Sequence, residues 1–520
     1  MIPRLPEDAA GGESRRATVA LAVVAAAVFL MEFVPSFFGA YGYFIDELYY
    51  VACSERLALG YVDHPPLAPW LLRLVREVLG DSIPAIRLLP ALCAAASVFL
   101  TGWMARRMGA GIYGQVLAAL ALALAPVPLI LFGFFSMNAF GMLFWICACL
   151  ILVEIARGGD PRLWLLFGAV AGVGLMNKHT FVLLAVGLAA GLVLTPERRF
   201  LAGKWLWLGA GLAFLFLLPN LWWQLQQGWP SLEFYKNADL LKNVPTPPWK
   251  VLVDQILFMN PASLPIWLGG LVFCLGGRDR RFRFLGWFFL ALLVLVMVAQ
   301  KSRPDRIVGA YPVMFAAGAV WWDAQRHRRG FGWTRWALPA LLVVVGTALA
   351  PLSLPVLPPP QLASYSATLG IVPQLEQGAG KVSPLPQWFA DRLGWEELVE
   401  KVAAAADELT PEERARALIL MPSYGHAGAL ELLGRGNDLP RVVSGHNTYH
   451  LWGFGGEEPE ALITVGYGPQ SLSELFEDFR QVATYRCDYC MAWRQDAPIY
   501  VVRGRKASVR EAWPDFKHFE

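Results

Sequence analysis

The sequence predicts a polytopic α-helical membrane protein that ends in a soluble α/β domain. Of its 520 residues, 56% are hydrophobic and only 16% are charged, whereas soluble proteins carry about 25% charged residues. Apolar runs that fit bilayer-spanning helices recur up to residue 356 and then stop. The net charge of +3 is small, so no nucleic-acid partner is expected.

About eleven apolar runs fit membrane-spanning helices, which need roughly 20 residues each. They lie at 17–38, 84–104, 112–132, 137–156, 163–177, 179–195, 205–223, 251–275, 284–300, 307–322 and 336–356. The two runs between 163 and 195 are short and fit a bent hairpin, so the count can change by one or two. The first run also resembles a secretory signal peptide, but many runs follow it and no small-residue cleavage site is evident.

Positive charges predict the orientation of these helices, because loops rich in lysine and arginine stay on the cytoplasmic side. The clusters recur in alternate loops: Arg15-Arg16, Arg106-Arg107, Arg157 with Arg162, Arg198-Arg199 with Lys204, Arg278 to Arg283, and Arg326 to Arg335. We therefore predict a cytoplasmic N-terminus and, with an odd number of spans, a C-terminal domain outside. The segments 39–83, 224–250 and 301–306 then also face outward.

A proline-rich stretch, 351–360, separates the two predicted domains, 1–356 and 357–520. Strand-like runs then alternate with helix-like ones, which favours a partly parallel sheet. The strand-like runs are RALILMP (416–422), RVVSG (441–445), ALITVGY (461–467) and PIYVVRG (498–504). The helix-like runs are WEELVEKVAAAADEL (395–409), AGALELLG (427–434) and SLSELFEDF (471–479).

The cysteines divide into two groups. Cys53 lies in the first outer loop, and four others fall in apolar runs, where they act as small hydrophobic residues: Cys93, Cys147, Cys149 and Cys274. Cys487 and Cys490 form a C-x-x-C pair in the outer domain, where a local disulfide is the favoured interpretation. Free structural thiols, metal binding and a redox site remain alternatives.

Two adjacent carboxylates, Asp46 and Glu47, follow the first apolar run within YFIDELYY (43–50). They fit the first turn of a helix, where acidic side chains are stabilising. Charged residues at a membrane edge are also functional candidates. The pair alone leaves both interpretations open.

The sequence after this pair predicts a shaped loop at the membrane surface. A helix begins near Asp46, and two prolines in YVDHPPL (61–67) fix an irregular turn. An amphipathic helix is expected over 67–79, with Arg73 and Arg76 on its polar side.

Seven motifs, the first two of them within this loop, occur in order along the chain. They are DELY (46–49), GYVDHPPLAPWLLRL (60–74), RLLPAL (87–92), FSMNAFGMLFW (135–145), GDPRLWLLFGAVAGVGLMNKHT (159–180), PNLWWQLQQGWPSLEFYKN (219–237) and GAYPVMFAAGA (309–319). This ordered set resembles the polyprenyl-phosphate-dependent glycosyltransferases of the GT-C fold. That family includes the bacterial aminoarabinose transferases of lipid A and the protein O-mannosyltransferases. The outer domain is similar to that of a bacterial branch of the family.

The resemblance implies a GT-C domain over 1–356 with a catalytic first outer loop, 39–83. The expected enzyme sits in the inner (plasma) membrane and acts on its outer, periplasmic side. It moves a sugar from a polyprenyl-phosphate donor to a hydroxyl of an envelope lipid, glycan or protein, with inversion. The sequence does not identify the sugar or the acceptor.

The resemblance also implies roles for individual residues. Asp46 is expected to be the general base, and Glu47 supports it in orientation or metal binding. Candidate substrate-binding residues are Tyr49, Asp63, His64, Asn138, Lys178 and Glu233, together with Lys301, Arg303 and Arg306, which suit a lipid phosphate. The alternative for the four cations is interfacial snorkelling. Asn138 and Gly141 stand where relatives carry acidic residues, which puts a second catalytic carboxylate in doubt.

The use of a metal ion and the functional class stay open. Glu47, Asp63, His64 and Glu233 are candidate ligands for a divalent ion, but one His beside one Asp does not specify a site. His446 and His450 have the spacing of ligands on a helix, although GHNTYH (445–450) reads as a loop or strand. Two other classes are a transporter or flippase of lipid-linked sugars and an inactive glycan-binding scaffold.

Overall fold

A computed structural model describes residues 7–243, 245–277, 279–299, 303–370 and 383–520. The chain divides into two compact units. The first contains the described residues up to Phe38, Ile86–Trp222 and Asn243–Leu354. The second contains Gly39–Ala85, Trp223–Lys242 and the described part of Pro355–Glu520. The second unit therefore joins the C-terminal part to two segments that lie between apolar runs.

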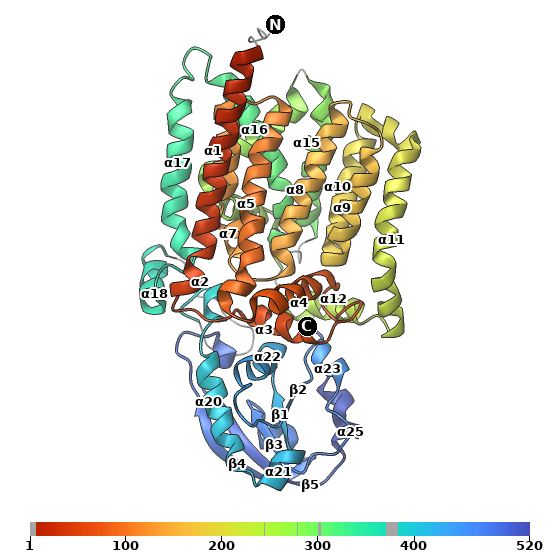
Figure 1. Cartoon of the computed structure of the whole chain (residues 1–520), viewed down its shortest axis with the longest axis vertical. Helices are drawn as coiled ribbons and strands as arrows, with labels where there is room; N and C mark the ends of the chain where they lie inside the picture. Colours follow the sequence, from red (N-terminus) through yellow and green to blue (C-terminus); the bar gives the residue numbers. More distant parts are fainter. Residues whose placement is uncertain (1–6, 244, 278, 300–302, 371–382) are drawn as a thin grey trace. The chain divides into compact units, whose positions relative to one another are not determined.

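The first unit is a bundle of apolar helices that run side by side (Figure 1). Its helices are α1 (Glu7–Phe33), α2 (Pro35–Phe38), α5 (Ile83–Met108), α6 (Ile112–Ala123), α7 (Pro126–Phe132), α8 (Met137–Ala156), α9 (Leu163–Asn177), α10 (Val182–Val193), α11 (Lys204–Gln226), α13 (Pro248–Phe258), α14 (Leu264–Leu271), α15 (Arg283–Val298), α16 (Tyr311–Gln325) and α17 (Thr334–Leu349). The protein is thus a multi-pass integral membrane protein, as the composition predicts.

The number of spans is somewhat lower than the predicted eleven. Among the described residues, seven helical segments are long and apolar enough to cross a membrane, or up to ten if each of three bent pairs is one span. The bent pairs, at 112–132, 179–202 and 248–276, change direction by 66°, 116° and 95°. The remaining run is α9, whose 15 residues give a helix of only about 22 Å, shorter than the roughly 30 Å hydrocarbon core. The sides on which the termini lie stay predictions.

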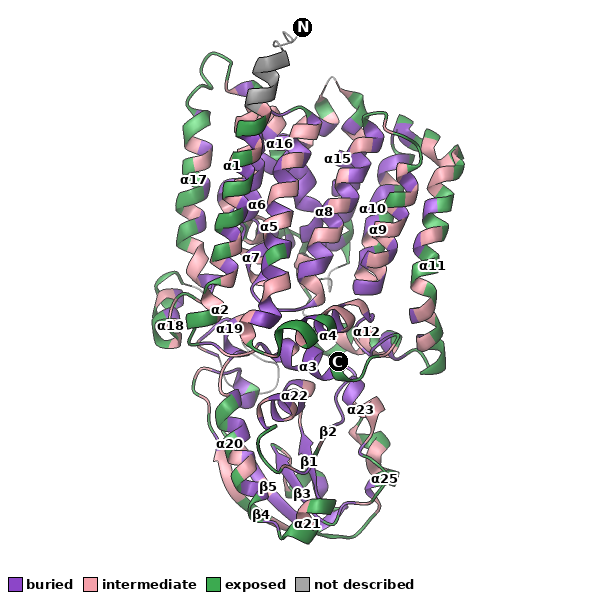
Figure 2. Cartoon of the chain, viewed as in Figure 1, coloured by how far each residue is buried: buried purple, intermediate pink, exposed green. Residues whose placement is uncertain are grey.

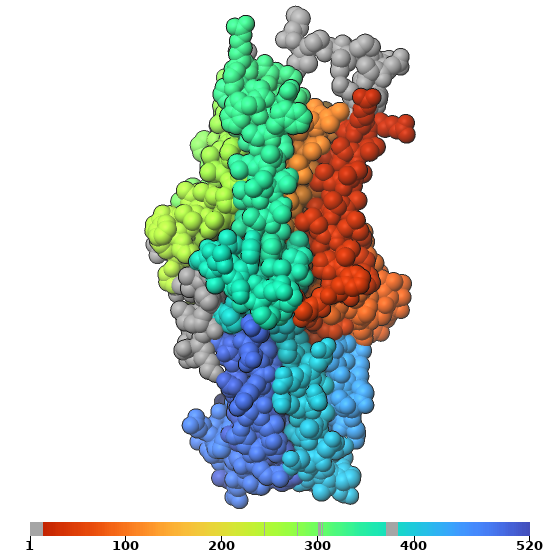
Figure 3. Space-filling model, turned by 90° about the vertical axis from the view of Figure 1, so that its left-hand side faces the viewer, coloured from red at the N-terminus to blue at the C-terminus, as the bar shows by residue number. Residues whose placement is uncertain are grey.

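Burial separates inner from outer helices of the bundle. Within its most apolar window, α8 is 72% buried, whereas α11 and α17 are only 17% buried (Figure 2). Figure 3 shows α17 as an exposed column on one face of this unit, and its Trp336 and Val344 are 71% and 66% exposed. Apolar side chains on such a face suit lipid contact. Small residues allow the close inner packing, because a Cβ at Gly318 of α16 would lie 1.7 Å from the carbonyl oxygen of Ile266.

The second unit contains a five-stranded mixed sheet with the order β2-β1-β3-β5-β4. The strands are β1 (Leu418–Met421), β2 (Arg441–Ser444), β3 (Leu462–Val465), β4 (Phe476–Tyr485) and β5 (Ala497–Arg505). β1 pairs in parallel with β2 and β3, and β5 pairs antiparallel with β3 and β4. The predicted α/β domain with a partly parallel sheet is confirmed.

Helices surround this sheet and extend the unit. They are α3 (Ile45–Glu55), α4 (Leu67–Leu79), α12 (Pro230–Leu241), α18 (Pro359–Thr368), α19 (Gln387–Ala390), α20 (Trp395–Ala406), α21 (Pro411–Arg416), α22 (Tyr424–Leu433), α23 (Thr448–Trp452), α24 (Pro469–Leu472) and α25 (Val509–Ala512). One face of the sheet packs into a core that includes Leu418, Leu462, Phe476 and Val502.

One predicted helix of the outer domain is wrong. The run SLSELFEDF contains only the end of the short helix α24, and β4 begins at Phe476. β4 pairs with β5 from Phe476↔Arg505 to Tyr485↔Ala497, with one irregularity near Gln481. This long pairing outweighs the helix propensity of the Leu and Glu residues.

The amphipathic helix predicted over 67–79 is confirmed as α4. Its Leu74 and Val78 are 60% and 72% exposed. On its polar side, Arg76 forms ion pairs with Glu55 at 2.7 Å and Asp81 at 2.5 Å. These charges fasten α4 to the end of α3.

Cys487 and Cys490 form a disulfide, as favoured from the sequence, and the other five cysteines are free. Replacing both by serine is expected to lower the free energy of unfolding of the second unit by about 2 kcal/mol, the entropic contribution of closing a four-residue loop. Thermal unfolding in detergent measures the change. Reductant should lower the midpoint of the wild type and leave the double serine variant unchanged; a wild type that is insensitive to reductant would contradict the prediction.

Candidate functional site

The two adjacent carboxylates of α3 have different surroundings. The backbone N–H of Phe44 donates to Oε2 of Glu47 at 2.8 Å, and Glu47 is fully buried. Glu47 therefore caps the start of α3, where its charge is also favoured. Asp46 is only partly buried. Neighbouring side chains on a helix point about 100° apart, which explains why one residue caps and the other reaches a different environment.

Asp46 is hydrogen bonded to the C-terminal part of the chain. The phenol of Tyr424 donates to Oδ1 of Asp46 at 2.9 Å, although the two residues are 378 positions apart. Tyr424 begins α22, directly after β1. Its ring stacks on that of Tyr49, with centroids 4.5 Å apart and an interplanar angle of 28°.

Tyr49 is in turn hydrogen bonded to a second carboxylate, that of Asp63. Its hydroxyl lies 2.9 Å from Oδ1 of Asp63 and 2.5 Å from Oγ1 of Thr448. A phenol has one proton and a carboxylate only accepts, so Tyr49 donates to Asp63 and the Thr448 hydroxyl donates to Tyr49. The backbone N–H of Val62 completes the chain by donating to Thr448 at 3.0 Å.

We call these five residues, Asp46, Tyr49, Asp63, Tyr424 and Thr448, the two-carboxylate site. Burial and the charge of Asp63 hold the pKa of Tyr49 well above its usual value. Burial and the charges of Asp46 and Asp63 do the same to the pKa of Tyr424. Both phenols therefore stay protonated and act as hydrogen-bond donors at neutral pH.

Two glycines explain how α22 comes so close to α3. A Cβ at Gly428 would lie 2.6 Å from the carbonyl oxygen of Leu48, and one at Gly425 would lie 2.1 Å from a side-chain carbon of Ile45. Helices can approach at backbone distance only where such side chains are absent. α22 thus packs directly on α3, the helix that carries Asp46.

His64 and Glu233 make their observed contacts with groups other than Asp46 and Asp63. His64 is 1% exposed, lies among the rings of Tyr49, Tyr50 and Tyr61, and its Nδ1 donates to the carbonyl of Pro65 at 2.9 Å. Burial lowers its pKa, which keeps the ring neutral. Glu233 forms an ion pair with Lys517 at 2.9 Å.

The candidate metal ligands therefore do not converge on one point. Glu47 caps α3, and the ring of His64 packs on that of Tyr50. Within the part of the chain that the structure describes, no three His, Cys, Asp or Glu side chains gather as a metal site. His446 lies outside a helix and bridges to His518, whereas His450 belongs to the short helix α23.

The first unit gathers several of the other predicted residues. Nζ of Lys178 donates to Oδ1 of Asn138 at 2.6 Å. Arg303 pairs with Asp305 through two hydrogen bonds, at 3.0 and 2.9 Å. Lys178 also acts electrostatically on Asp305. Arg306 follows in the same turn, η6 (Pro304–Ala310), while Lys301 falls outside the described residues.

Sequence reasoning missed three residues of these clusters. Asp305 lies between Arg303 and Arg306, the two cations expected to bind the lipid phosphate. Tyr424 and Thr448 follow the ends of two predicted parallel strands, β1 and β2. Ligand-binding residues often lie at the carboxyl ends of such strands, so that position was an available signal.

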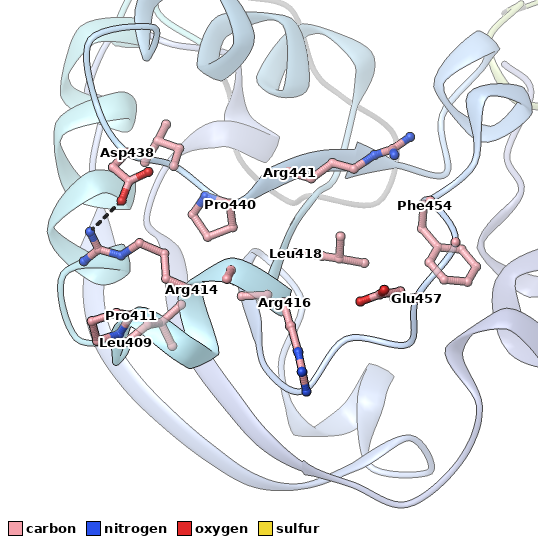
Figure 4. A pocket seen from close by; sticks show the side chains of 15 residues that line it. Leu409, Pro411, Arg414, Arg416, Leu418, Asp438, Pro440, Arg441, Phe454 and Glu457 are labelled. Carbon is pink, nitrogen blue, oxygen red and sulfur yellow. Dashed lines mark hydrogen bonds and ion pairs between the residues drawn. The ribbon is translucent and has the colours of Figure 1, made fainter.

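An open cavity of about 550 Å³ lies at the opposite, amino ends of β1 and β2 (Figure 4). It is lined by Arg414, Arg416, Arg441, Phe454 and Glu457, among others. The guanidinium groups point in different directions, and Arg414 and Arg416 are already paired with Asp438 and Glu460. The cavity therefore presents no converging set of charges.

Residues 63–223 match the profile of the dolichyl-phosphate-mannose-protein mannosyltransferase family. This segment, about a third of the chain, is therefore similar to that family of membrane glycosyltransferases. A curated relative is the lipid A galacturonosyltransferase RgtD of Rhizobium johnstonii, 32% identical over 36% of this chain and 40% of its own. Another is an undecaprenyl phosphate-alpha-4-amino-4-deoxy-L-arabinose arabinosyl transferase of Pseudomonas fluorescens, 27% identical over 35% of this chain and 32% of its own. The matched part thus spans well under half of either relative.

Solved structures extend the likeness to the whole fold. The structure of ArnT from Cupriavidus metallidurans bound to undecaprenyl phosphate is similar over 93% of this chain and 97% of that chain, with a TM-score of 0.59 and 14% identity. The mycobacterial arabinofuranosyltransferase AftD matches 94% of this chain and 40% of its own, with a TM-score of 0.52 and 16% identity. The predicted GT-C fold with a C-terminal α/β domain is confirmed.

Proposed function

We propose that this chain is a polyprenyl-phosphate-dependent glycosyltransferase of the inner membrane. It transfers a sugar to an acceptor hydroxyl on the extracytoplasmic face. The pattern of positively charged loops supports this face, because it predicts that the segments carrying the two-carboxylate site lie outside. The observation that carries the proposal is Asp46, a partly exposed carboxylate held by a phenol donor in a GT-C chain. The ArnT-like fold supports a lipid-phosphate donor.

The reaction is a single displacement at the anomeric carbon. The acceptor oxygen forms a bond to that carbon while the bond from the carbon to the phosphate oxygen breaks, which inverts the configuration. The acceptor proton passes to Asp46, and polyprenyl phosphate leaves with the bonding electrons. Lys178 and Arg303 supply positive charge for the leaving phosphate, one as a point charge and the other as a planar fork.

The relatives favour lipid A as the acceptor and an acidic or amino sugar as the donor. RgtD is named as a lipid A galacturonosyltransferase, and the second relative is named for 4-amino-4-deoxy-L-arabinose. We infer that this chain modifies a lipid A-like glycolipid with a sugar of one of these two kinds. The partners are then the lipid-linked donor, this glycolipid and the bilayer.

Transfer by the purified full chain in detergent tests the proposal. The donors are undecaprenyl-phosphate galacturonic acid and undecaprenyl-phosphate aminoarabinose, labelled in the sugar, and lipid A is the acceptor. We expect labelled lipid A and an equal amount of released undecaprenyl phosphate from one donor. Donor that binds but stays intact in detergent would overturn the proposal, and intact labelled donor that crosses proteoliposomes would assign the chain as a transporter instead.

Lys178→Met is expected to lower kcat/KM for the donor about 10- to 100-fold, the usual effect of losing a hydrogen bond to a charged group. Lys178→Arg keeps the charge and should lose less. The control is Lys250→Met, because Lys250 pairs with Asp254 on the exposed side of α13. Equal donor kinetics in Lys178→Met and wild type would remove Lys178 from the phosphate site.

A further inference from the structure

We propose that the C-terminal α/β part supplies two positioning residues, Tyr424 and Thr448, which hold Asp46 and Asp63 in their working geometry. The inference rests on the proposed function, in which Asp46 is the general base. It gives the C-terminal part a direct role in turnover. Both residues follow the carboxyl ends of adjacent parallel strands, β1 and β2.

The phenol of Tyr424 is fixed in direction before any substrate arrives. Its ring packs against those of Tyr49 and His446, each with a centroid distance of 4.5 Å. His446 is itself held, because its Nε2 donates to the carbonyl of Glu520 at 3.0 Å and its ring stacks on His518. A side chain packed against two such rings keeps its hydroxyl on Oδ1 of Asp46 without further ordering.

Thr448 is fixed by the backbone that precedes it. Asn447 adopts a φ of +47°, which is strained for a residue other than glycine. Two hydrogen bonds hold it there: its N–H donates to the carbonyl of His518 at 3.1 Å, and its Oδ1 accepts from the N–H of Glu520 at 3.1 Å. Strain held in this way places the Thr448 hydroxyl between Tyr49 and the N–H of Val62.

The two tyrosines couple the carboxylates. Each phenol donates to one carboxylate, Tyr424 to Asp46 and Tyr49 to Asp63, and the two rings stack. Because the rings stack, a shift of one ring also moves the other. The phenol donors of both carboxylates then change position together. Such a network orients a general base relative to its acceptor hydroxyl, and small misplacements of a base reduce turnover rather than binding.

Tyr424→Phe keeps the ring and removes only the hydroxyl. We expect kcat to fall about 10- to 100-fold, as for other hydrogen bonds to a charged group. The KM values for donor and acceptor and the thermal midpoint should stay unchanged. The matched control is Tyr467→Phe, because Tyr467 packs on the same sheet and its hydroxyl makes no hydrogen bond with the described residues.

Thr448 offers rescue by a conservative change. Thr448→Ser retains the hydroxyl and should keep most of kcat, whereas Thr448→Val has the same shape without it and should lower kcat about tenfold. If Thr448 had only a structural role, Thr448→Ser and Thr448→Val would not differ in kcat while sharing the same thermal midpoint. Equal kcat for Ser and Val would remove Thr448 from the inference.

A double-variant cycle tests whether Tyr424 acts through Asp46. In an Asp46→Asn background, Tyr424→Phe should cause no further loss, because residues that act as a unit are not additive. An equal further loss would overturn the inference. A wild-type kcat in Tyr424→Phe, with Asp46→Asn inactive, would overturn the inference and leave the proposed function intact. Full activity of Asp46→Asn would overturn the role of Asp46 and the inference with it.

Discussion

Asp46→Asn is expected to lower kcat about 10²- to 10⁴-fold, the range that a positioned general base contributes. Asparagine has the same shape and still offers an oxygen to the phenol of Tyr424, so the hydrogen bond of the site survives. It cannot take the proton of the acceptor hydroxyl. Transfer of labelled sugar under saturating donor, together with a separate donor-binding assay, measures the effect.

The control for this change is Glu77→Gln, which neutralises an exposed acid on α4 that pairs locally with Arg73. We expect its turnover to match the wild type. If Asp46→Asn keeps turnover within a few-fold of wild type, another group takes the proton, and Asp63 is then the next to test because it lies across the tyrosine pair.

Gly428→Val is expected to destabilise the second unit by about 2–3 kcal/mol, as overpacking of a close contact does. The new Cβ would lie 2.6 Å from the backbone oxygen of Leu48, which cannot move aside as a side chain could. For a domain of this size, the midpoint of thermal unfolding should fall by roughly 5–10 °C. Turnover should fall as well, because α22 carries Tyr424 away from Asp46.

Gly436→Val is the matched control, since no atom of the described residues lies within 4 Å of a Cβ at that exposed position. Its midpoint and turnover should stay close to wild type. A Gly428→Val protein that unfolds at the wild-type temperature and turns over normally would show that α22 and α3 do not cross at backbone distance in solution.

Local patterns in the sequence were enough to predict most elements of the fold. Each apolar run corresponds to a helix or a bent helix pair, and α3, α4, α20 and α22 were expected where they occur. The four strand-like runs became β1, β2, β3 and β5. These predictions succeed because hydrophobic length and periodicity are properties of neighbouring residues.

Pairing and bending were decided by the tertiary structure. β4 forms inside a run of helix-forming residues because β5 offers it a long antiparallel partner. Three apolar runs are bent by more than 40°, which hydropathy does not record. Hydropathy therefore predicted the positions of the apolar segments more accurately than the number of segments that cross the membrane.

The candidate site shows the same division. The sequence identified Asp46, Tyr49 and Asp63 as neighbours in one loop, since all lie within 39–83. It could not separate the capping role of Glu47 from the partly exposed position of Asp46, because that depends on where α3 begins. It could not identify Tyr424 and Thr448 as partners, because their hydrogen bonds span 378 and 399 residues of chain. Such contacts exist only after α22 packs on α3 through Gly425 and Gly428, and long-range packing of this kind leaves no periodic trace in a single sequence.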